Sequence, residues 1–331
     1  MSNDPSHLSL IAEALGNLGY GPAVSPDEYR LVAGGLSGSS VYAIHLADER
    51  VVLKVTLPTS TPALLDQAGR EASFYQRLAQ DVPLAVPRLV ATSTSKASGV
   101  AILLGACEPT PPLTVWTDRD YTDIAAQLGQ FHGRFWGKAD RLRTFRWLHP
   151  APPTAPSIRF RQAMSAWRVM SERKELDDGM TLRRIQTIPD LMARLSRLDP
   201  PPALPETLLH GDCHPDNLLQ NQAREWIWAD WQAVRTGQGP VDLAFLWQRA
   251  EIGGGHVPRE AMAREYQTGL EVEGAETPMP DKLELALAWA EFTSWLLDWP
   301  PYLAGASACR IGSVLDRMDG LIERLEMSRP N

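Results

Sequence analysis

The chain has 331 residues, of which 44% are hydrophobic and 22% charged, and its formal net charge is −8. These values exclude wholesale disorder and are typical of about two globular domains or one two-lobed unit. The negative charge argues against nucleic acid or an anionic membrane surface as partner, because both reward clustered Lys and Arg. No apolar run approaches the ~20 residues of a membrane helix. The three cysteines form no CxxC pair and the first residues lack the form of a signal peptide, so we expect a cytoplasmic location.

The first third of the chain predicts a small lobe that mixes helix and strand. Thr61 followed by Pro62 is typical of a helix start, and the apolar stripe after it extends to Leu78. A further amphipathic helix is expected over 6–18, and strands over 41–46, 51–57, 88–93 and 100–105. We therefore predict an N-terminal lobe over 1–108, with an antiparallel sheet and a helix.

The remainder of the chain, 109–331, predicts a larger and mainly helical lobe. The proline-rich segment Glu108–Pro112 resists regular structure and is the candidate linker. Helices are expected over 120–137, 157–175, 181–198, 242–251, 258–271, 281–298 and 307–327.

The most informative polar residues of this larger lobe lie in and after the segment His210–Asn217, which stands between two apolar pairs. Asp230 follows a second apolar run. If 217–220 and 225–230 form a hairpin, its midpoint falls in the polar turn between them, and Asn217 and Asp230 then lie side by side. Their amide and carboxylate oxygens suit Mg²⁺. Asp212, on the same loop, suits a base that orients a hydroxyl.

Asp212, four intervening residues, Asn217 and a downstream Asp230 match the spacing of a phosphoryl-transfer site. The variant His-Gly-Asp-x-His-x-x-Asn, the strand ending in Asp-Trp and the block Gly239–Ala244 closely resemble the aminoglycoside phosphotransferase and choline kinase-like family, over roughly residues 30 to 250. The resemblance implies an α+β, protein-kinase-like fold of two lobes. It also implies transfer of the γ-phosphoryl group of ATP, or alternatively GTP, to a hydroxyl of a small molecule. Asp212 would be the catalytic residue, and Asn217 and Asp230 the Mg²⁺ ligands.

The small lobe offers the phosphate-binding residues that such a site needs. Lys54 is the only charged residue within its predicted strand, and Glu71 lies on the apolar stripe of the helix after it. A buried carboxylate costs several kcal/mol unless it is paired, so we predict a Lys54–Glu71 ion pair that presents the ammonium to the nucleotide phosphates. Upstream, the small residues Gly35, Ser37, Gly38 and Ser39 are expected to cover the phosphates with backbone N–H groups.

Several alternatives stay open. The same fold could serve as a catalytically inactive nucleotide-binding sensor or scaffold, and His210 and His214 could instead be ligands of a metal-dependent hydrolase. His132, His210 and Asp242 are expected to be structural, Asp242 as a helix N-cap that also bonds the 210–217 loop. A monomer is slightly favoured, although no feature of the sequence fixes the oligomeric state.

The acceptor also stays open between two classes. Residues 230–331 contain sixteen Asp and Glu against nine Lys and Arg. We expect this excess to reflect solvated outer helix faces, with an acidic cleft for a cationic acceptor such as an aminoglycoside as its alternative. The aromatic stripe from Trp289 to Trp299 is expected to be core, with the wall of an apolar acceptor pocket as its alternative.

Overall fold

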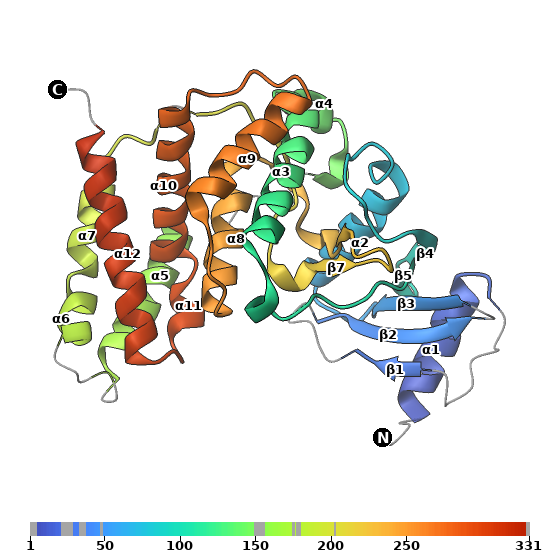
Figure 1. The fold of residues 1–331 in the computed structure, drawn as a ribbon. Coiled ribbons are helices and arrows are strands. Elements are labelled where there is room, and N and C mark those ends of the chain that lie inside the picture. The colour runs from blue at the N-terminus through green and yellow to red at the C-terminus, as the bar shows by residue number, and fades with distance from the viewer. Residues whose placement is uncertain are drawn as a thin grey trace.

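The computed structural model describes residues 5–20, 29–32, 38–46, 49–148, 156–173, 176, 180–201 and 203–328. Figure 1 shows a smaller lobe built on a sheet and a larger helical lobe beside it. This is the predicted α+β, protein-kinase-like arrangement. Of the helices in these ranges, none is both long enough and apolar enough to cross a membrane.

The sheet of the small lobe is antiparallel and has the strand order β1-β2-β3-β5-β4. Four of its strands were expected, and the edge strand β1 was not. The strands are β1 (Tyr29–Leu31), β2 (Ser40–Leu46), β3 (Glu49–Thr56), β4 (Leu89–Ser95) and β5 (Gly99–Gly105).

Each face of the sheet is covered by one helix. On one face α1 (Pro5–Asn17) packs on Leu53 and Leu103, and on the other α2 (Pro62–Arg77) packs on Ile102. Because side chains alternate along a strand, the odd-numbered apolar residues of β3 face α1 and Lys54 faces α2. The sheet therefore delivers one lysine to the side on which α2 lies.

The large lobe is mainly helical, as predicted. Its helices in the described ranges are α3 (Asp118–Arg134), α4 (Ala139–Leu142), α5 (Pro156–Ser171), α6 (Met180–Gln186), α7 (Ile188–Leu195), α8 (Pro240–Ile252), α9 (Arg259–Val272), α10 (Pro280–Leu297), α11 (Pro300–Leu303) and α12 (Ala308–Met327). The single helix expected over 181–198 is wrong, because α6 and α7 are separated at Thr187. Pro189 disfavours a helical conformation in the residue before it and is tolerated only in the first turn of a new helix.

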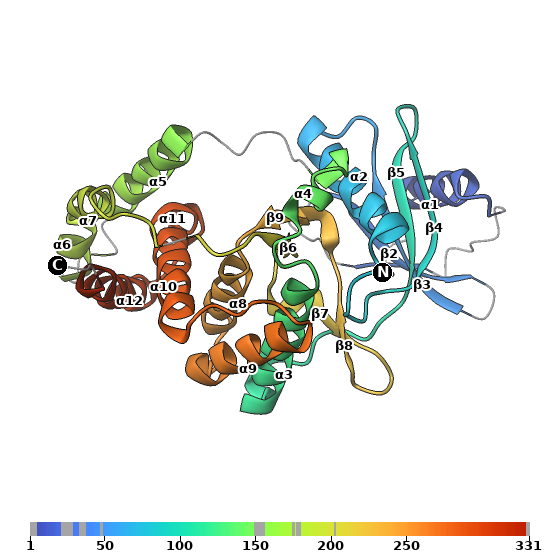
Figure 2. The same ribbon diagram turned by 90° about the horizontal axis from the view of Figure 1, so that it is seen from above.

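Close helix packing brings α3 and α9 together beneath the lobe junction. A Cβ on Gly129 would lie 2.1 Å from the backbone oxygen of Tyr266, and one on Gly269 would lie 2.2 Å from that of Ala126. Only glycine fits at this crossing. Figure 2 shows α3 and α9 next to the small lobe, and α6, α7 and α12 at the opposite end of the molecule.

Four short strands of the large lobe form two separate pairs. β6 (Thr207–Leu209) pairs with β9 (Arg235–Gly237), and β7 (Leu218–Gln220) pairs with β8 (Trp226–Trp228), both antiparallel. The linker after β5 joins this region, since Glu108 and Gln220 exchange two backbone hydrogen bonds of 2.8 and 3.0 Å. The segments singled out in the sequence therefore lie where the two lobes meet.

Candidate active site

Gly211 sets the path of the loop that carries Asp212. Its φ is +83°, and a Cβ there would lie 2.1 Å from the backbone oxygen of Ala233. A side chain would be strained by both the conformation and the contact. The residue before Asp212 is therefore held against the segment that follows Asp230.

Asp242 anchors this loop from the first turn of α8. Its carboxylate accepts backbone hydrogen bonds from His210 at 2.7 Å and from Gly211 at 3.1 Å, and it lies 3.4 Å from Nε2 of His132. The bond to the loop is confirmed. The N-cap role is wrong, because the cap position is Gly239 and Asp242 is the third residue of the helix. Burial alone would raise the pKa of Asp242, but His132 outweighs it and lowers that pKa.

His210 and His132 are buried structural residues, as expected. The Nε2 of His210 lies 3.0 Å from the backbone oxygen of Ala229, and its Nδ1 accepts from the backbone N–H of Asp212 at 3.3 Å. Burial lowers the pKa of His210, so its ring is neutral and donates through Nε2. His132 bonds the Tyr266 hydroxyl at 2.8 Å through its other ring nitrogen. Both nitrogens of His210 are thus occupied within the protein.

Asp212 remains ionised at the surface of the loop, with a third of its side chain exposed. The imidazole of His214 lies beside it, with Nε2 3.6 Å from the carboxylate. Burial alone would raise the pKa of Asp212, but His214, His210 and Arg249 together lower it. The carboxylate is therefore able to accept a proton or a hydrogen bond from a hydroxyl group.

Asn217 offers one oxygen to the site. Its Nδ2 donates to the backbone oxygen of Asp212 at 2.9 Å, and the side chain is buried. A carbonyl only accepts, so the amide nitrogen must face it and Oδ1 points elsewhere. Thr110 of the linker fixes the same turn, because its hydroxyl bonds the backbone oxygens of Pro215 and Leu218 at 2.9 and 2.7 Å.

The predicted hairpin exists, but its register differs by one residue. Asn217 lies opposite Ala229, whose backbone N–H donates to the backbone oxygen of Asn217 at 2.9 Å. Asn217 and Asp230 are therefore not directly paired. The reason is the turn. Asn221 closes it by accepting the backbone N–H of Glu225, and Arg224 adopts a left-handed φ of +64°. This centres the hairpin half a residue earlier than the sequence suggested.

Asp230 is brought to Lys54 by its own backbone conformation. Its φ is +64°, uncommon outside glycine, and its Oδ1 accepts from Lys54 Nζ at 3.0 Å. Lys54 Nζ also donates to both carboxylate oxygens of Glu71, at 2.8 and 2.6 Å, so the predicted ion pair is present. Burial alone would lower the pKa of Lys54, but the two carboxylates outweigh it and raise that pKa. The lysine is therefore a fixed cation.

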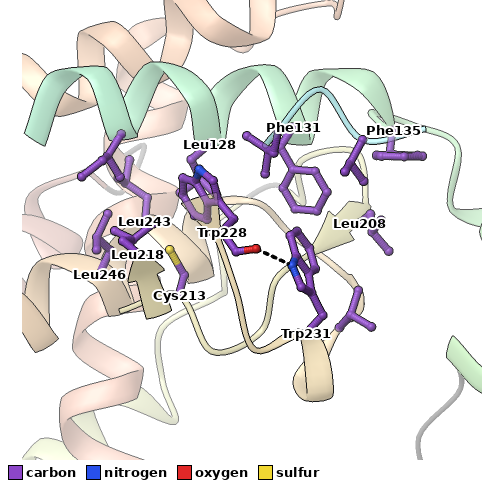
Figure 3. Packing of buried hydrophobic residues seen from close by; sticks show 14 of the residues in the cluster. Leu128, Phe131, Phe135, Leu208, Cys213, Leu218, Trp228, Trp231, Leu243 and Leu246 are labelled. Atoms are coloured by element: carbon purple, nitrogen blue, oxygen red, sulfur yellow. Dashed lines mark hydrogen bonds between the residues drawn. The ribbon is translucent and has the colours of Figure 1, made fainter. Parts of the chain in front are cut away.

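Two contacts that sequence reasoning missed hold α2 against the segment after Asp230. Phe74 stacks on Trp231 with ring centroids 3.9 Å apart and an interplanar angle of 9°, and Arg70 donates to the backbone oxygen of Gln232 at 2.7 Å. Figure 3 shows that Trp231 also donates to the backbone oxygen of Trp228, at 2.8 Å, within the hydrophobic cluster beneath the loop. The aromatic residue after Asp230 was the available signal, but nothing in the sequence pairs it with Phe74.

The remaining predicted residues are placed only in part. The Ser39 hydroxyl lies 2.7 Å from the hydroxyl of Thr56, which is two residues after Lys54 in β3. Gly38 has a φ of +74°. Gly35 and Ser37 lie outside the described residues. The aromatic stripe from Trp289 to Trp299 is largely core, since its rings at 292, 295 and 299 are buried.

His210 shows how closely the site's carboxylates gather. Asp242, Asp212 and Asp230 all lie near enough for their charges to raise the pKa of this one imidazole, against the larger effect of burial. Asp230 in turn bonds Lys54. The structure thus brings together a lysine, four carboxylates and the amide of Asn217 from five segments of the chain.

Comparison with known proteins agrees with this geometry. The profile of the phosphotransferase enzyme family matches residues 28–278. No curated protein sequence matches the chain significantly. Among solved structures, the apoenzyme of macrolide 2'-phosphotransferase MphH from Brachybacterium faecium superposes with a TM-score of 0.58 and 18% identity, covering 99% of this chain and 100% of that one.

Two further structures show the same fold at similarly low identity. The GDP complex of aminoglycoside 2'-phosphotransferase-IIIa has a TM-score of 0.56 and 14% identity, covering 98% of this chain and 99% of that one. A microcompartment-associated aminopropanol kinase has a TM-score of 0.56 and 18% identity, covering 97% and 98%. With three quarters of its length matched by the family profile, this chain belongs to the phosphotransferase enzyme family.

Proposed function

We propose that this phosphotransferase moves the γ-phosphoryl group of ATP, or alternatively of GTP, to a hydroxyl of a small molecule. The observation that carries the proposal is the contact of Lys54 with both Glu71 and Asp230. A cation held by two carboxylates at the lobe junction suits the phosphates of a nucleotide. A structural neighbour was solved as a GDP complex, which supports nucleotide use by this fold.

Lys54 would bind the α- and β-phosphates, with its position fixed by Glu71. Asp230 and the free Oδ1 of Asn217 would hold Mg²⁺, since a carboxylate and an amide oxygen are the hard ligands that this ion prefers. The bound ion would neutralise charge on the transferred group. No group of three or more His, Cys, Asp or Glu in the described residues is arranged to hold a metal, so a hydrolytic zinc site has less support.

Asp212 would orient the acceptor hydroxyl and accept its proton. Its lowered pKa keeps it ionised at neutral pH, and the Asp242 anchor holds its loop in place. We assign nucleotide binding to the lobe over 1–108, including Gly35, Ser37, Gly38 and Ser39, and acceptor binding to the lobe over 109–331.

The test compares the parent with Asp212→Asn, which keeps the shape and removes the proton acceptor. Purified protein is incubated with Mg²⁺, ATP or GTP and a panel of small alcohols, and nucleoside diphosphate release is followed. We expect release with at least one alcohol and a fall of about 10²-fold or more in the variant. The melting temperature should rise equally in both proteins when ATP·Mg²⁺ is added, because Asp212 does not bind the nucleotide.

Two outcomes would contradict the proposal. Stabilisation by a nucleotide without diphosphate release from any acceptor would favour a nucleotide sensor. Stabilisation by zinc but by neither nucleotide would favour a hydrolase.

A further inference from the structure

We propose that the acceptor is an alcohol with an apolar body and no more than one positive charge, bound along a row of aromatic rings beside Asp212. The inference rests on the proposed function, because it names the acceptor class of that same site. It decides between the two acceptor classes that the sequence leaves open.

The row begins at the proposed catalytic residue. His214 lies 3.6 Å from the Asp212 carboxylate, and its ring centroid is 6.4 Å from that of Phe245 on α8. Phe245 is 6.2 Å from Trp299, which is 6.1 Å from Tyr302 on α11. We call these four rings the aromatic row. It leads without a gap from the transfer site towards the helices of the large lobe.

The row has a buried, rigid middle and one exposed end, at Tyr302. Trp299 is buried, and its Nε1 donates to Gln248 at 2.9 Å, so it cannot rotate freely. Tyr302, by contrast, is 73% exposed, and Val241, one turn before Phe245 on the same face of α8, is 39% exposed. An exposed tyrosine that continues a packed aromatic series offers a ready surface for an apolar group.

The charges beside the row do not favour a polycation. Asp216, next to His214, lies 3.3 Å from Arg249. Asp298, before Trp299, accepts from Arg159 Nε at 2.6 Å. Each of these flanking carboxylates is already neutralised by an arginine. Asp298, the flanking carboxylate that belongs to the acidic excess of residues 230–331, is therefore already paired.

These features favour an apolar acceptor over a polycationic one. A neutral apolar body gains from contact with the rings, and a single ammonium can also lie on a ring face. A polycation such as an aminoglycoside would need several free carboxylates and would meet Arg249 and Arg159 instead. Of the carboxylates named beside the row, Asp212 alone lacks an arginine within ion-pair distance.

The first experiment measures binding without nucleotide, so that it does not depend on phosphoryl transfer. Saturation-transfer NMR is recorded on the full chain with 2-naphthaleneethanol, a neutral aromatic alcohol, and separately with kanamycin, at equal concentration and salt. We expect naphthaleneethanol to bind and kanamycin to bind at least tenfold more weakly. Absence of naphthaleneethanol binding, or tighter binding of kanamycin, would overturn the proposal.

The second experiment locates that binding. Tyr302→Ala should weaken naphthaleneethanol about five- to tenfold, because one aromatic contact is lost. Tyr302→Phe, which keeps the ring, and Tyr20→Ala, the same truncation in the small lobe, should bind like the parent. Equal binding by Tyr302→Ala would overturn the proposed row, and circular dichroism establishes that the variant is folded.

A third measurement separates the two proposals. Asp212→Asn should retain naphthaleneethanol binding within twofold, since it removes only the proton acceptor. Ring-dependent binding together with no diphosphate release from any acceptor would refute the transferase function and leave the apolar surface in place. Release with polycationic alcohols alone would refute the acceptor class and leave the transferase function standing.

Discussion

Replacing Glu71 by Gln tests whether the buried ion pair serves catalysis or stability. Removing one partner of a fully buried pair costs about 3–5 kcal/mol when the other charge is left alone. Here Lys54 keeps Asp230 at 3.0 Å, and Gln retains one of the two oxygens that now accept at 2.8 and 2.6 Å. We therefore expect the free energy of unfolding to fall by only about 1–2 kcal/mol.

Turnover should fall much more than stability. Without the Glu71 charge, Lys54 is drawn towards Asp230 and away from the phosphates, so one aligned cation is lost from the transition state. The loss of a single such donor lowers kcat by about 10²-fold or more. Diphosphate release at saturating ATP, Mg²⁺ and acceptor gives kcat, and urea unfolding gives the stability change.

A matched control is Glu284→Gln, which makes the same change at an exposed pair with Arg324. It should alter stability by less than about 1 kcal/mol and leave kcat unchanged. If Glu71→Gln lost several kcal/mol of stability but kept parental kcat, the pair would be structural and our interpretation of Lys54 would be wrong.

Three other substitutions probe the metal ligands, the loop and the large lobe. Asp230→Asn should weaken Mg²⁺-dependent ATP binding, measured by calorimetry, more than Asn217→Ala does, because a carboxylate supplies charge as well as an oxygen; parental affinity in both would remove them as ligands. Gly211→Ala should lower stability by about 2–4 kcal/mol in thermal melts, since the new Cβ meets a backbone oxygen at 2.1 Å, and an unchanged Tm would contradict that geometry. Glu291 is buried, which alone would raise its pKa, but its two arginine partners outweigh burial and lower that pKa. The ionised carboxylate therefore contributes to the free energy of unfolding above its unfolded pKa of about 4.3. This contribution disappears as the pH falls through the lower folded pKa. The unfolding free energy of the parent should therefore fall more steeply than that of Glu291→Gln below about pH 4, and parallel curves would refute this assignment.

Local pattern was sufficient for most of the elements and for the buried pair. Alternation along 51–57 put Lys54 on one face of its strand, and helical spacing put Glu71 on a buried stripe. Each charge then had one plausible partner, which made a long-range contact predictable. The position of Asp242 before an apolar run indicated a structural role with a bond to the loop, although the N-cap role inferred with it was wrong.

The hairpin register was beyond this reasoning because it depends on backbone conformations that carry no strong residue signal. Arg224 and Asp230 are the two non-glycine residues with positive φ among those described, and neither residue type predicts that conformation. The break before Pro189 was readable but was outweighed by helical periodicity. The stack of Phe74 on Trp231 depends on how two lobes meet, which no local pattern encodes.

That stack also bears on how the protein is controlled. Withdrawing α2 from the large lobe would break the aromatic contact and the Arg70 hydrogen bond at once, a cost of about 2–3 kcal/mol before the ion pair is counted. Such a withdrawn form would make up about one molecule in a hundred. Asp230 and Lys54 are accordingly aligned at rest. The rate of the reaction in a cell would then follow the supply of nucleotide and acceptor, with no separate switching event required at this helix.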